Sequence, residues 1–114
     1  GANYKEEAFD EKLLENYKNG ANIILDCVGA SHWHKNLNSI AVDGRFVSYG
    51  FLSGASVKPL NESDPTFSIV PILRKRISII GTTLRSRSNE YKSKLIADFT
   101  KRIVNPLIAT KRIE

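Results

Sequence analysis

The feature of this chain that best indicates a binding site is a set of three glycines at or near the ends of apolar, strand-like segments. Gly29 follows the apolar run 22–28, Gly50 follows a second run, and Gly81 lies near the end of a third. Glycine at such a place lets backbone or a ligand come close where a side chain would intrude. The carboxyl ends of parallel strands share one sheet edge, where α/β proteins bind ligands. We therefore expect a ligand crevice there. A flat apolar wall and hydroxyl groups for a ring-shaped ligand would come from Tyr49, Phe51 and Thr83.

Other kinds of chemistry have weaker support. His32 and His34 flank Trp33, but side chains two apart on a helix point to different faces, and no Cys, Asp or Glu completes a metal set. We predict no metal ion and interpret both histidines as surface residues. The sequence has no Gly-x-Ser-x-Gly elbow, no Gly-x-Gly-x-x-Gly fingerprint and no Walker loop. Ser53 is interpreted as an ordinary loop residue, and Cys27, inside an apolar strand, as a small core residue.

Length and composition indicate one globular domain. The chain has 114 residues, of which 41% are apolar and 25% charged. Its single cysteine excludes an intrachain disulfide and fits a reducing compartment. Because the sequence shows no signal-peptide pattern and no apolar run of ~18 residues, we expect a cytoplasmic protein without a membrane partner. The chain begins at Gly1 and contains no methionine, so we expect a fragment of a longer protein.

The formal net charge is +5, and most of the surplus lies in the last third of the chain. Such a balance can attract nucleic acid or a phosphorylated ligand. Nucleic-acid binding also needs aromatic side chains on the basic face for base stacking. Only Tyr91 and Phe99 are available, and both fall on the predicted core side of a helix. We therefore prefer a solvated helix face with one or two anion-binding arginines, and regard a nucleic-acid partner as disfavoured.

The residue pattern predicts alternating helices and strands. Helices are predicted over 6–18, from Ser31 to about Ala41, over about 66–75, and from Ser88 onward. Strands are predicted over 22–28, 45–49 and 77–83. Turn signals stand at Asn19-Gly20 and Asp43-Gly44, and residues 51–66 lack periodicity and read as a loop. Pro71 is expected to limit or kink the third helix. The last helix should turn one face to a core through Tyr91, Leu95, Ile96, Phe99 and Ile103.

These elements predict the fold class. Continuous apolar strands are typical of a parallel sheet buried on both faces. Strict alternation of helix and strand implies right-handed crossovers between parallel strands. Three strands form only a thin sheet, so we predict an α/β fold that is half of a doubly wound parallel sheet with flanking helices.

Five segments together resemble a known family. They are Asn3–Glu7, Ile24–Gly29, Trp33–Leu37, Asp43–Gly50 and Gly81–Arg87. Each is weak alone, but their order and spacing over nearly the whole chain resemble the zinc-independent quinone oxidoreductases of the medium-chain dehydrogenase/reductase superfamily. The likeness is greatest to NADPH quinone oxidoreductases of the tumour-suppressor-inducible type. The resemblance implies that this region is the latter half of a Rossmann doubly wound parallel sheet, so that residues 1–114 would be a partial nucleotide-binding domain.

The resemblance implies NADPH as cofactor and assigns binding roles to residues of this chain. Tyr4 would stack near or hydrogen-bond the adenosine 2′-phosphate end, and Val28 and Gly29 would pass under the ribose and pyrophosphate. The nicotinamide side would be lined by Tyr49, Gly50, Phe51 and Leu52. That pocket would be closed by Thr83, Leu84 and Arg85.

The implied reaction is hydride transfer from NADPH to a quinone or a related activated carbonyl or alkene. No residue of this chain would act as acid, base or nucleophile, because its contribution is to position the nicotinamide. The family's glycine-rich fingerprint and substrate domain lie outside this region, so the 114 residues alone are expected to be inactive. Two alternatives stay open: an enoyl reductase of the same superfamily, which shares every segment quoted, and a basic nucleic-acid-binding module.

The same resemblance implies a partner and marks one departure. The strand at 77–83 matches an edge strand that pairs across a two-fold axis in the family, which implies a homodimer. The loop at 57–66 is longer than is usual in the family, so its role in substrate access is open.

Overall fold

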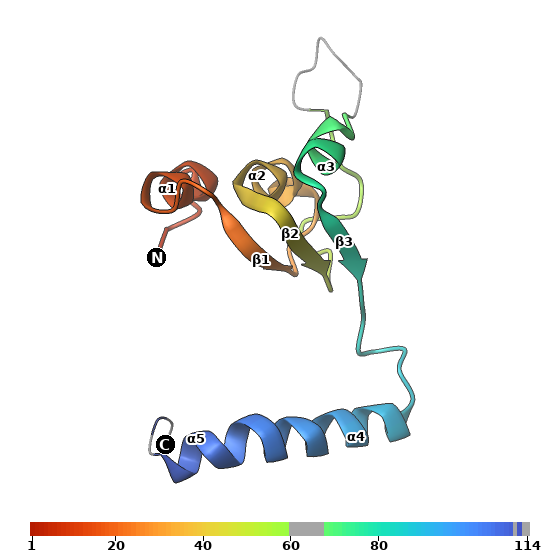
Figure 1. Cartoon of the computed structure of the whole chain (residues 1–114). Helices are drawn as coiled ribbons and strands as arrows, with labels where there is room; N and C mark the ends of the chain where they lie inside the picture. The colour runs from red at the N-terminus through yellow and green to blue at the C-terminus, as the bar shows by residue number, and fades with distance from the viewer. Residues whose placement is uncertain (60–67, 111, 113–114) are drawn as a thin grey trace. The chain divides into compact units, whose positions relative to one another are not determined.

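A computed structural model describes residues 1–59, 68–110 and 112. The chain divides into two compact units, Gly1–Thr82 and Thr83–Glu114. Figure 1 labels the helices and strands of both units. Each unit is described by itself.

The first unit is built on a three-stranded parallel sheet with the strand order β1-β2-β3. The strands are β1 (Ala21–Asp26), β2 (Ile40–Ser48) and β3 (Ser78–Gly81). Phe46, in the central strand, is in register with Ile24 on one side and Ile79 on the other. The predicted α/β fold, with three parallel strands and flanking helices, is confirmed.

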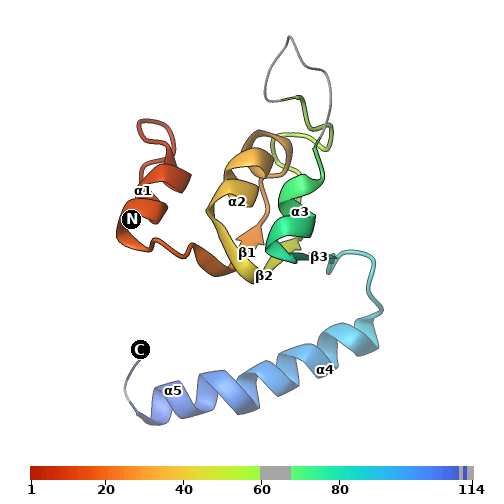
Figure 2. The same ribbon diagram turned by 45° about the horizontal axis from the view of Figure 1, so that its top comes forward.

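Among its described residues, the first unit has four short helices. They are α1 (Phe9–Asn16), the 3₁₀ helix η1 (Ala30–His32), α2 (Trp33–Ser39) and α3 (Val70–Lys75). Figures 1 and 2 show α2 and α3 side by side on one face of the sheet. The first helix begins later than predicted, because the N–H groups of Glu6 and Glu7 both donate to the carbonyl of Asn3 in a separate turn (3.0 and 2.9 Å).

The second helix differs from its prediction at both ends. Ser31 lies within η1 and caps nothing, and the residue before α2 is His32, whose side chain makes no capping hydrogen bond. At the other end α2 stops at Ser39, while Ile40 and Ala41 enter β2. Both of these apolar side chains are buried. Burial against the sheet outweighs the helical periodicity from which the longer helix was predicted.

The predicted turn at Asp43-Gly44 lies inside β2 as an irregularity of the strand. Ala21 pairs with Ile40, and Ile23, two residues further along β1, pairs with Arg45, which is five residues further along β2. Such extra residues form a bulge, and Asp43 adopts a left-handed backbone there (φ +59°). Arg76 donates from Nε and Nη2 to the two Asp43 carboxylate oxygens (2.8 and 2.7 Å). This hydrogen-bonded ion pair lowers the pKa of the Asp43 carboxyl.

The segment between β2 and α3 is only partly described. Residues 51–59 have no helix or strand, as predicted, and residues 60–67 lie outside the described part of the chain. The helix α3 begins at Val70, with Pro71 in its first turn. Pro71 therefore does not kink the helix, because a first-turn residue needs no N–H partner within the helix.

The core of the first unit lies between the sheet and the two helices α2 and α3. Its buried members are Leu37, Ile40, Phe46 and Ile77, with Ile24, Trp33 and Ile72 packed against them. Phe46 is at its centre, with 0% of its surface exposed. The Trp33 ring lies 5.1 Å from the Phe46 ring, centroid to centroid. This cluster fixes the distance between the helices and β2.

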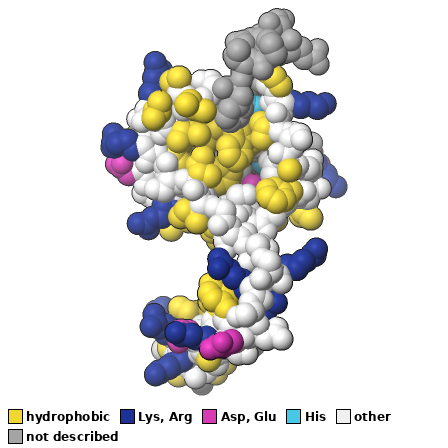
Figure 3. Space-filling view, turned by 90° about the vertical axis from the view of Figure 1, so that its right-hand side faces the viewer, with side chains coloured by type: hydrophobic (Ala, Val, Ile, Leu, Met, Phe, Trp, Pro, Cys, Tyr) yellow, Lys and Arg dark blue, Asp and Glu magenta, His cyan; other side chains and the backbone are white. Residues whose placement is uncertain are grey.

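Burial of the sheet on both faces, which the apolar strands predict, is wrong for this unit by itself. Ile23 and Leu25 are 58% and 67% exposed, whereas Ile24 between them packs on the core. Because side chains alternate along a strand, helices on one face cover only every second residue of β1. The strand β3 stands at the end of the strand order and is exposed throughout. Figure 3 shows exposed hydrophobic side chains gathered on this unit.

Lys75 ties α3 to the end of α2. Its Nζ donates to the backbone carbonyls of Leu37, Asn38 and Ile40, at 2.9, 2.7 and 2.9 Å. The last carbonyls of a helix lack partners within it, and a cation suits the negative end of the helix dipole. Partial burial lowers the pKa of Lys75.

We expect Lys75→Met to destabilise the intact protein by about 1–3 kcal/mol, because it leaves these carbonyls without their charged donor. The apolar stem is kept, so packing changes little. Urea denaturation measures the loss, and Lys94→Met on the exposed surface of the second unit is the control, expected to stay within ~0.5 kcal/mol. Equal effects for the two variants would show that the three hydrogen bonds contribute nothing.

The second unit is a helical rod. Its parts are α4 (Asn89–Phe99), the π-helical turn η2 (Thr100–Val104) and α5 (Asn105–Ala109). Ser88 caps α4 as predicted, since its Oγ accepts the N–H of Tyr91 at 3.1 Å. The π-helical turn comes just before Pro106, which has no N–H to continue the α-helical ladder. No helix among the described residues is long and apolar enough to cross a membrane.

The predicted core face of this last helix is not buried. All five of its members are exposed: Tyr91, Leu95, Ile96, Phe99 and Ile103. Among its described residues, the unit consists of consecutive helical segments with no second helix or sheet of the unit packed against them, so nothing within it covers an apolar stripe. Tyr91 and Phe99 are therefore not core residues of this unit, and the Arg87 guanidinium lies 4.9 Å from the centre of the Tyr91 ring.

Candidate functional site

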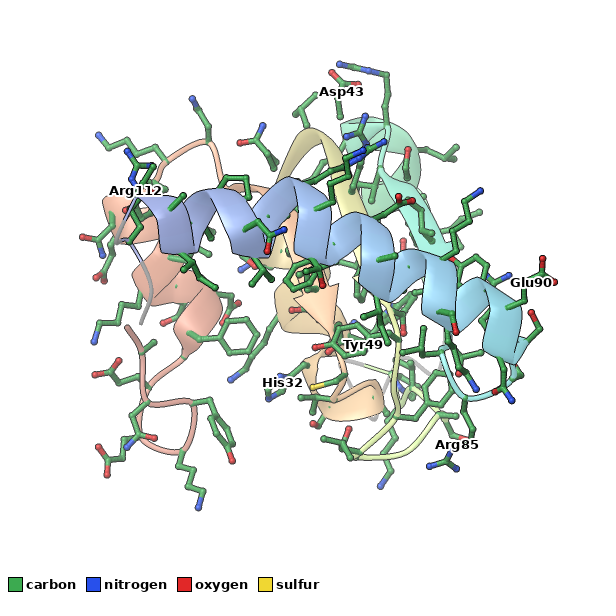
Figure 4. The ribbon with its side chains drawn as sticks, turned by 90° about the horizontal axis from the view of Figure 1, so that it is seen from below. His32, Asp43, Tyr49, Arg85, Glu90 and Arg112 are labelled. Carbon is green, nitrogen blue, oxygen red and sulfur yellow. The ribbon has the colours of Figure 1, made fainter. Side chains whose placement is uncertain are left out.

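The candidate site is built on two turns that leave the sheet at its carboxyl edge. We call residues 27–32 the β1 turn and residues 49–54 the β2 turn. Three backbone hydrogen bonds join the two turns: Leu52 N–H to Cys27 O (3.1 Å), Ser53 N–H to Val28 O (2.8 Å) and Ala30 N–H to Gly54 O (2.9 Å). A fourth joins Tyr49 N–H to the carbonyl oxygen of Asp26 (2.9 Å), the last residue of β1. Figure 4 shows His32 and Tyr49, one from each turn, toward one end of the first unit and Asp43 at the other.

The glycines of these turns allow the two backbones to meet. Gly29 has φ +86°, and a Cβ on it would lie 2.8 Å from the carbonyl oxygen of Gly54. A Cβ on Gly50 would lie 2.9 Å from the carbonyl oxygen of Cys27. Side chains at either position would collide with the opposite turn. The close neighbour at both glycines is protein backbone, and their contact with a ligand stays a prediction.

Asp26, at the end of β1, holds the β1 turn from inside. The residue is buried, with 4% of its surface exposed. Oδ1 accepts the N–H groups of Val28 (3.1 Å) and Gly29 (3.3 Å), and Oδ2 accepts that of Gly29 (3.1 Å). Aspartate commonly closes a turn by accepting backbone N–H groups two or three residues on.

Ser53 holds the same turn from the β2 side. Its hydroxyl donates to the carbonyl oxygen of Val28 (2.8 Å) and accepts the N–H of Ser31 (3.0 Å). Ser53 is therefore more than an ordinary loop residue, because its hydroxyl bridges two points of the neighbouring turn.

Tyr49 and Cys27 meet where the two turns begin. Cys27 is half-buried, so its interpretation as a core residue is only partly right. The hydrogen bond between the two side chains raises the pKa of Tyr49, and the nearby Asp26 carboxylate acts in the same direction. Tyr49 is half exposed and can present its ring to a ligand.

Tyr4 belongs to an aromatic cluster around His32. The rings of Tyr4 and Phe9 lie 5.7 and 5.0 Å from the His32 ring, and Lys35 Nζ lies 5.5 Å from the centre of the Phe9 ring. His34 is also packed, with Nε2 2.7 Å from the carbonyl oxygen of Lys58. Both histidines are half-buried, so they are partly exposed surface residues that also contact neighbouring side chains or backbone. The cluster links the amino-terminal turn to the β1 turn.

The remaining predicted site residues fall into two groups. Phe51 and Leu52 are exposed on the β2 turn, Leu52 by 83%, and Val28 is half-buried. The other group belongs to the second unit and consists of Thr83, Leu84 and Arg85. These three residues are exposed in the segment before α4. There the carbonyls of Leu84 and Arg85 accept hydrogen bonds from Arg87 N–H and Lys92 Nζ (3.2 and 3.3 Å).

A family model described as zinc-binding dehydrogenase matches residues 2–101, which is most of the chain. The chain belongs to this zinc-binding dehydrogenase family. It is thus a member of the medium-chain dehydrogenase/reductase superfamily. Because the family is described as zinc-binding, the question is whether the described residues include a group of side chains able to hold a zinc ion. Within residues 1–59, 68–110 and 112, no three His, Cys, Asp or Glu side chains form a group that could hold a metal ion, so we derive no step through zinc.

Individual relatives match at low identity. Mouse prostaglandin reductase-3 is 26% identical over 93 residues, which is 80% of this chain and 24% of the relative. A quinone oxidoreductase of Pseudomonas syringae pv. tomato superposes with a TM-score of 0.66 at 24% identity, covering 97% of this chain and 31% of that one. Escherichia coli quinone oxidoreductase complexed with NADPH gives 0.60 at 23% identity, covering 87% and 30%. The chain spans about a quarter of the curated relative's length.

No role was predicted from the sequence for three residues around the two turns, namely Asp26, Ser53 and His32. Asp26 is followed three residues later by glycine, a spacing typical of a side chain that closes a turn, and this signal could have identified it. Ser53 and His32 carry no such local signal, because their partners lie more than 20 residues away. The open question about the loop at 57–66 falls largely outside the described residues.

Proposed function

We propose that the intact protein is a zinc-independent, NADPH-dependent oxidoreductase of the tumour-suppressor-inducible quinone oxidoreductase type. This chain would be part of its cofactor-binding domain, and the acceptor a quinone or a related activated carbonyl. Membership of the dehydrogenase family supports an oxidoreductase. The names of a quinone oxidoreductase complexed with NADPH and of a prostaglandin reductase among the relatives support the cofactor and the acceptor class.

The observation that carries the proposal is the pair of interlocked turns at the carboxyl edge of the sheet. Four backbone hydrogen bonds fix their shape without any ligand. Exposed aromatic and apolar side chains stand on the fixed backbone, namely Tyr49, Phe51 and Leu52. A flat, uncharged ring gains most from covering such side chains, and a nicotinamide is a ring of this kind.

When bound, NADPH supplies a hydride to the acceptor. In this proposal the side chains of Tyr49, Phe51 and Leu52 hold the nicotinamide in one orientation and exclude water from it. Orientation alone can account for a large part of a transfer reaction's acceleration, since the donor and acceptor carbons must approach within about 3–3.5 Å. Thr83, Leu84 and Arg85 are proposed as further contacts of the nicotinamide. No residue of the chain is proposed as acid, base or nucleophile.

Tyr4 is proposed at the adenosine end of the cofactor. Its ring is held at its edge by His32, while more than half of the side chain stays exposed. The phenol can stack on the adenosine or donate a hydrogen bond to the 2′-phosphate. Val28 and Gly29 would lie under the ribose and pyrophosphate.

A homodimer and a cytoplasmic location also stay proposals. The homodimer would form through residues 77–83. The position of β3 at the end of the strand order supports this proposal, because among the described residues β3 pairs with one strand only, β2. An exposed edge of this kind can pair with a second copy.

The first test titrates the intact protein with NADPH and NADH, following nicotinamide fluorescence. NADPH is expected to bind more tightly, and Tyr4→Ala to weaken NADPH binding by about tenfold while changing NADH binding less, because a charge-assisted hydrogen bond to the phosphate is lost. Tyr17→Ala, an exposed tyrosine of the same unit, is the matched control and should bind both nucleotides as wild type does.

Absorbance of NADPH is then followed with a quinone and with an enoyl thioester as acceptors. Oxidation of NADPH by the quinone is the expected result. Oxidation by the enoyl thioester alone would favour the enoyl reductase alternative. Failure to bind either nucleotide would overturn the proposal.

A further inference from the structure

The backbone N–H groups of residues 28–32 in the β1 turn are all used within the protein. Five consecutive donors each have an acceptor: Val28 and Gly29 donate to the Asp26 carboxylate, Ala30 to Gly54 O, Ser31 to Ser53 Oγ and His32 to Gly29 O. In glycine-rich phosphate-binding loops such N–H groups are free and point to the anion. The β1 turn therefore cannot act as an anion nest in this shape.

Asp26 is suited to its place by having two equivalent acceptor oxygens. Gly29 N–H lies 3.3 Å from Oδ1 and 3.1 Å from Oδ2, and Oδ1 also accepts the N–H of Val28 (3.1 Å). An asparagine has one oxygen and one NH₂ group, and the NH₂ would face a backbone donor. Because Asp26 is almost fully buried, water cannot readily repair that mismatch.

Ser53 completes the restraint from the opposite side. The backbone of Val28 is held at both of its polar groups: Asp26 accepts its N–H, and its carbonyl oxygen accepts the hydroxyl and the N–H of Ser53, both at 2.8 Å. The same hydroxyl accepts the N–H of Ser31 (3.0 Å). The turn is thus clamped by one residue of its own strand and one residue of the β2 turn.

We propose that Asp26 and Ser53 are positioning residues for the nicotinamide cofactor, an inference that rests on the proposed function. Together they keep the β1 turn in one shape before the cofactor arrives. The turn then meets the dinucleotide through the surface of Val28, and gives no N–H group to a phosphate. A turn ordered in advance reduces the entropy that binding has to overcome.

Steady-state kinetics of the intact protein with NADPH and a quinone tests the proposal. Asp26→Asn is expected to raise KM for NADPH about tenfold and Ser53→Ala about threefold, the range that lost hydrogen bonds produce. The KM for the quinone should change little. Asp43→Asn is the matched control: it makes the same chemical change in the bulge of β2, where Asp43 pairs with Arg76, and should leave KM for NADPH unchanged.

Amide hydrogen exchange tests the clamp without cofactor. The N–H groups of Val28, Gly29 and Ser31 should exchange slowly in the wild-type protein, and Ser31 should exchange faster in Ser53→Ala. Ser53 is exposed, so this variant decides the matter even if Asp26→Asn fails to fold.

The outcomes separate the two proposals. Fast exchange of these amides in the wild-type protein, or wild-type KM values for NADPH in both variants, would overturn the clamp. If the wild-type protein bound no nicotinamide nucleotide, the proposed function would fail, and with it the cofactor role of the clamp.

Discussion

Alanine at position 29 is expected to destabilise the intact protein by about 3 kcal/mol or more, because strain and collision add. Gly29 has φ +86° and ψ −126°, a region that residues with a Cβ rarely enter. The added methyl would also lie 2.8 Å from Gly54 O and 3.2 Å from Phe51 Cα. Neither backbone atom can move without breaking the hydrogen bonds between the two turns. Urea unfolding, followed by tryptophan fluorescence, measures the loss.

Two other glycines separate strain from collision. Gly54 also has positive φ, +104°, but a Cβ there would meet nothing within 4 Å. Gly54→Ala should therefore cost about 1–2 kcal/mol from strain alone. Gly81, with open space and no positive φ, should tolerate alanine within ~0.5 kcal/mol. If Gly29→Ala and Gly54→Ala lost equal stability, close approach of the two turns would not be what requires glycine at position 29.

Phe46→Ala is expected to cost about 3–5 kcal/mol, the range for removing a buried aromatic ring from a packed core. Phe46 has 0% of its surface exposed and stands in register with both neighbouring strands. Its loss would leave a cavity under Trp33, whose ring lies 5.1 Å away. Phe46→Leu should recover a large part of the loss. Denaturant midpoints and the fluorescence maximum of Trp33, the single tryptophan, report both effects.

The control is a second phenylalanine of the same unit. Phe51 is 66% exposed on the β2 turn, so Phe51→Ala should change stability by less than ~0.5 kcal/mol. In the proposed function the same change weakens NADPH binding, since the ring borders the nicotinamide. A stability loss for Phe46→Ala no larger than that for Phe51→Ala would contradict the core described above.

Local signals were sufficient where they agreed with the packing. The apolar runs near Ile24 and Ile79 predict strands and are strands, since β-branched and apolar side chains fit a pleated surface. Ser88 predicts a helix start and caps α4, because its acceptor lies only three residues away. Where packing opposed the local pattern it prevailed, so Ile40 left the predicted helix and joined β2.

The candidate site shows the same division. Glycine at positions 29 and 50 predicts a close approach at the strand ends, and both glycines do lie against another backbone. The side chains that restrain this approach were harder to predict. Ser53 lies 25 residues from Val28 in sequence, and nothing in the loop around it distinguishes this serine from its neighbours.

The sequence by itself determined the order of elements, the parallel sheet and the glycine-ended strands, because these depend on hydrophobic periodicity and on backbone freedom within a few residues. Only the tertiary structure decided which strand face is covered, what approaches each glycine and which side chains restrain the β1 turn. Those features are contacts between residues distant in the chain. Asp26, Ser53 and Phe46 take their roles from neighbours that folding brings to them.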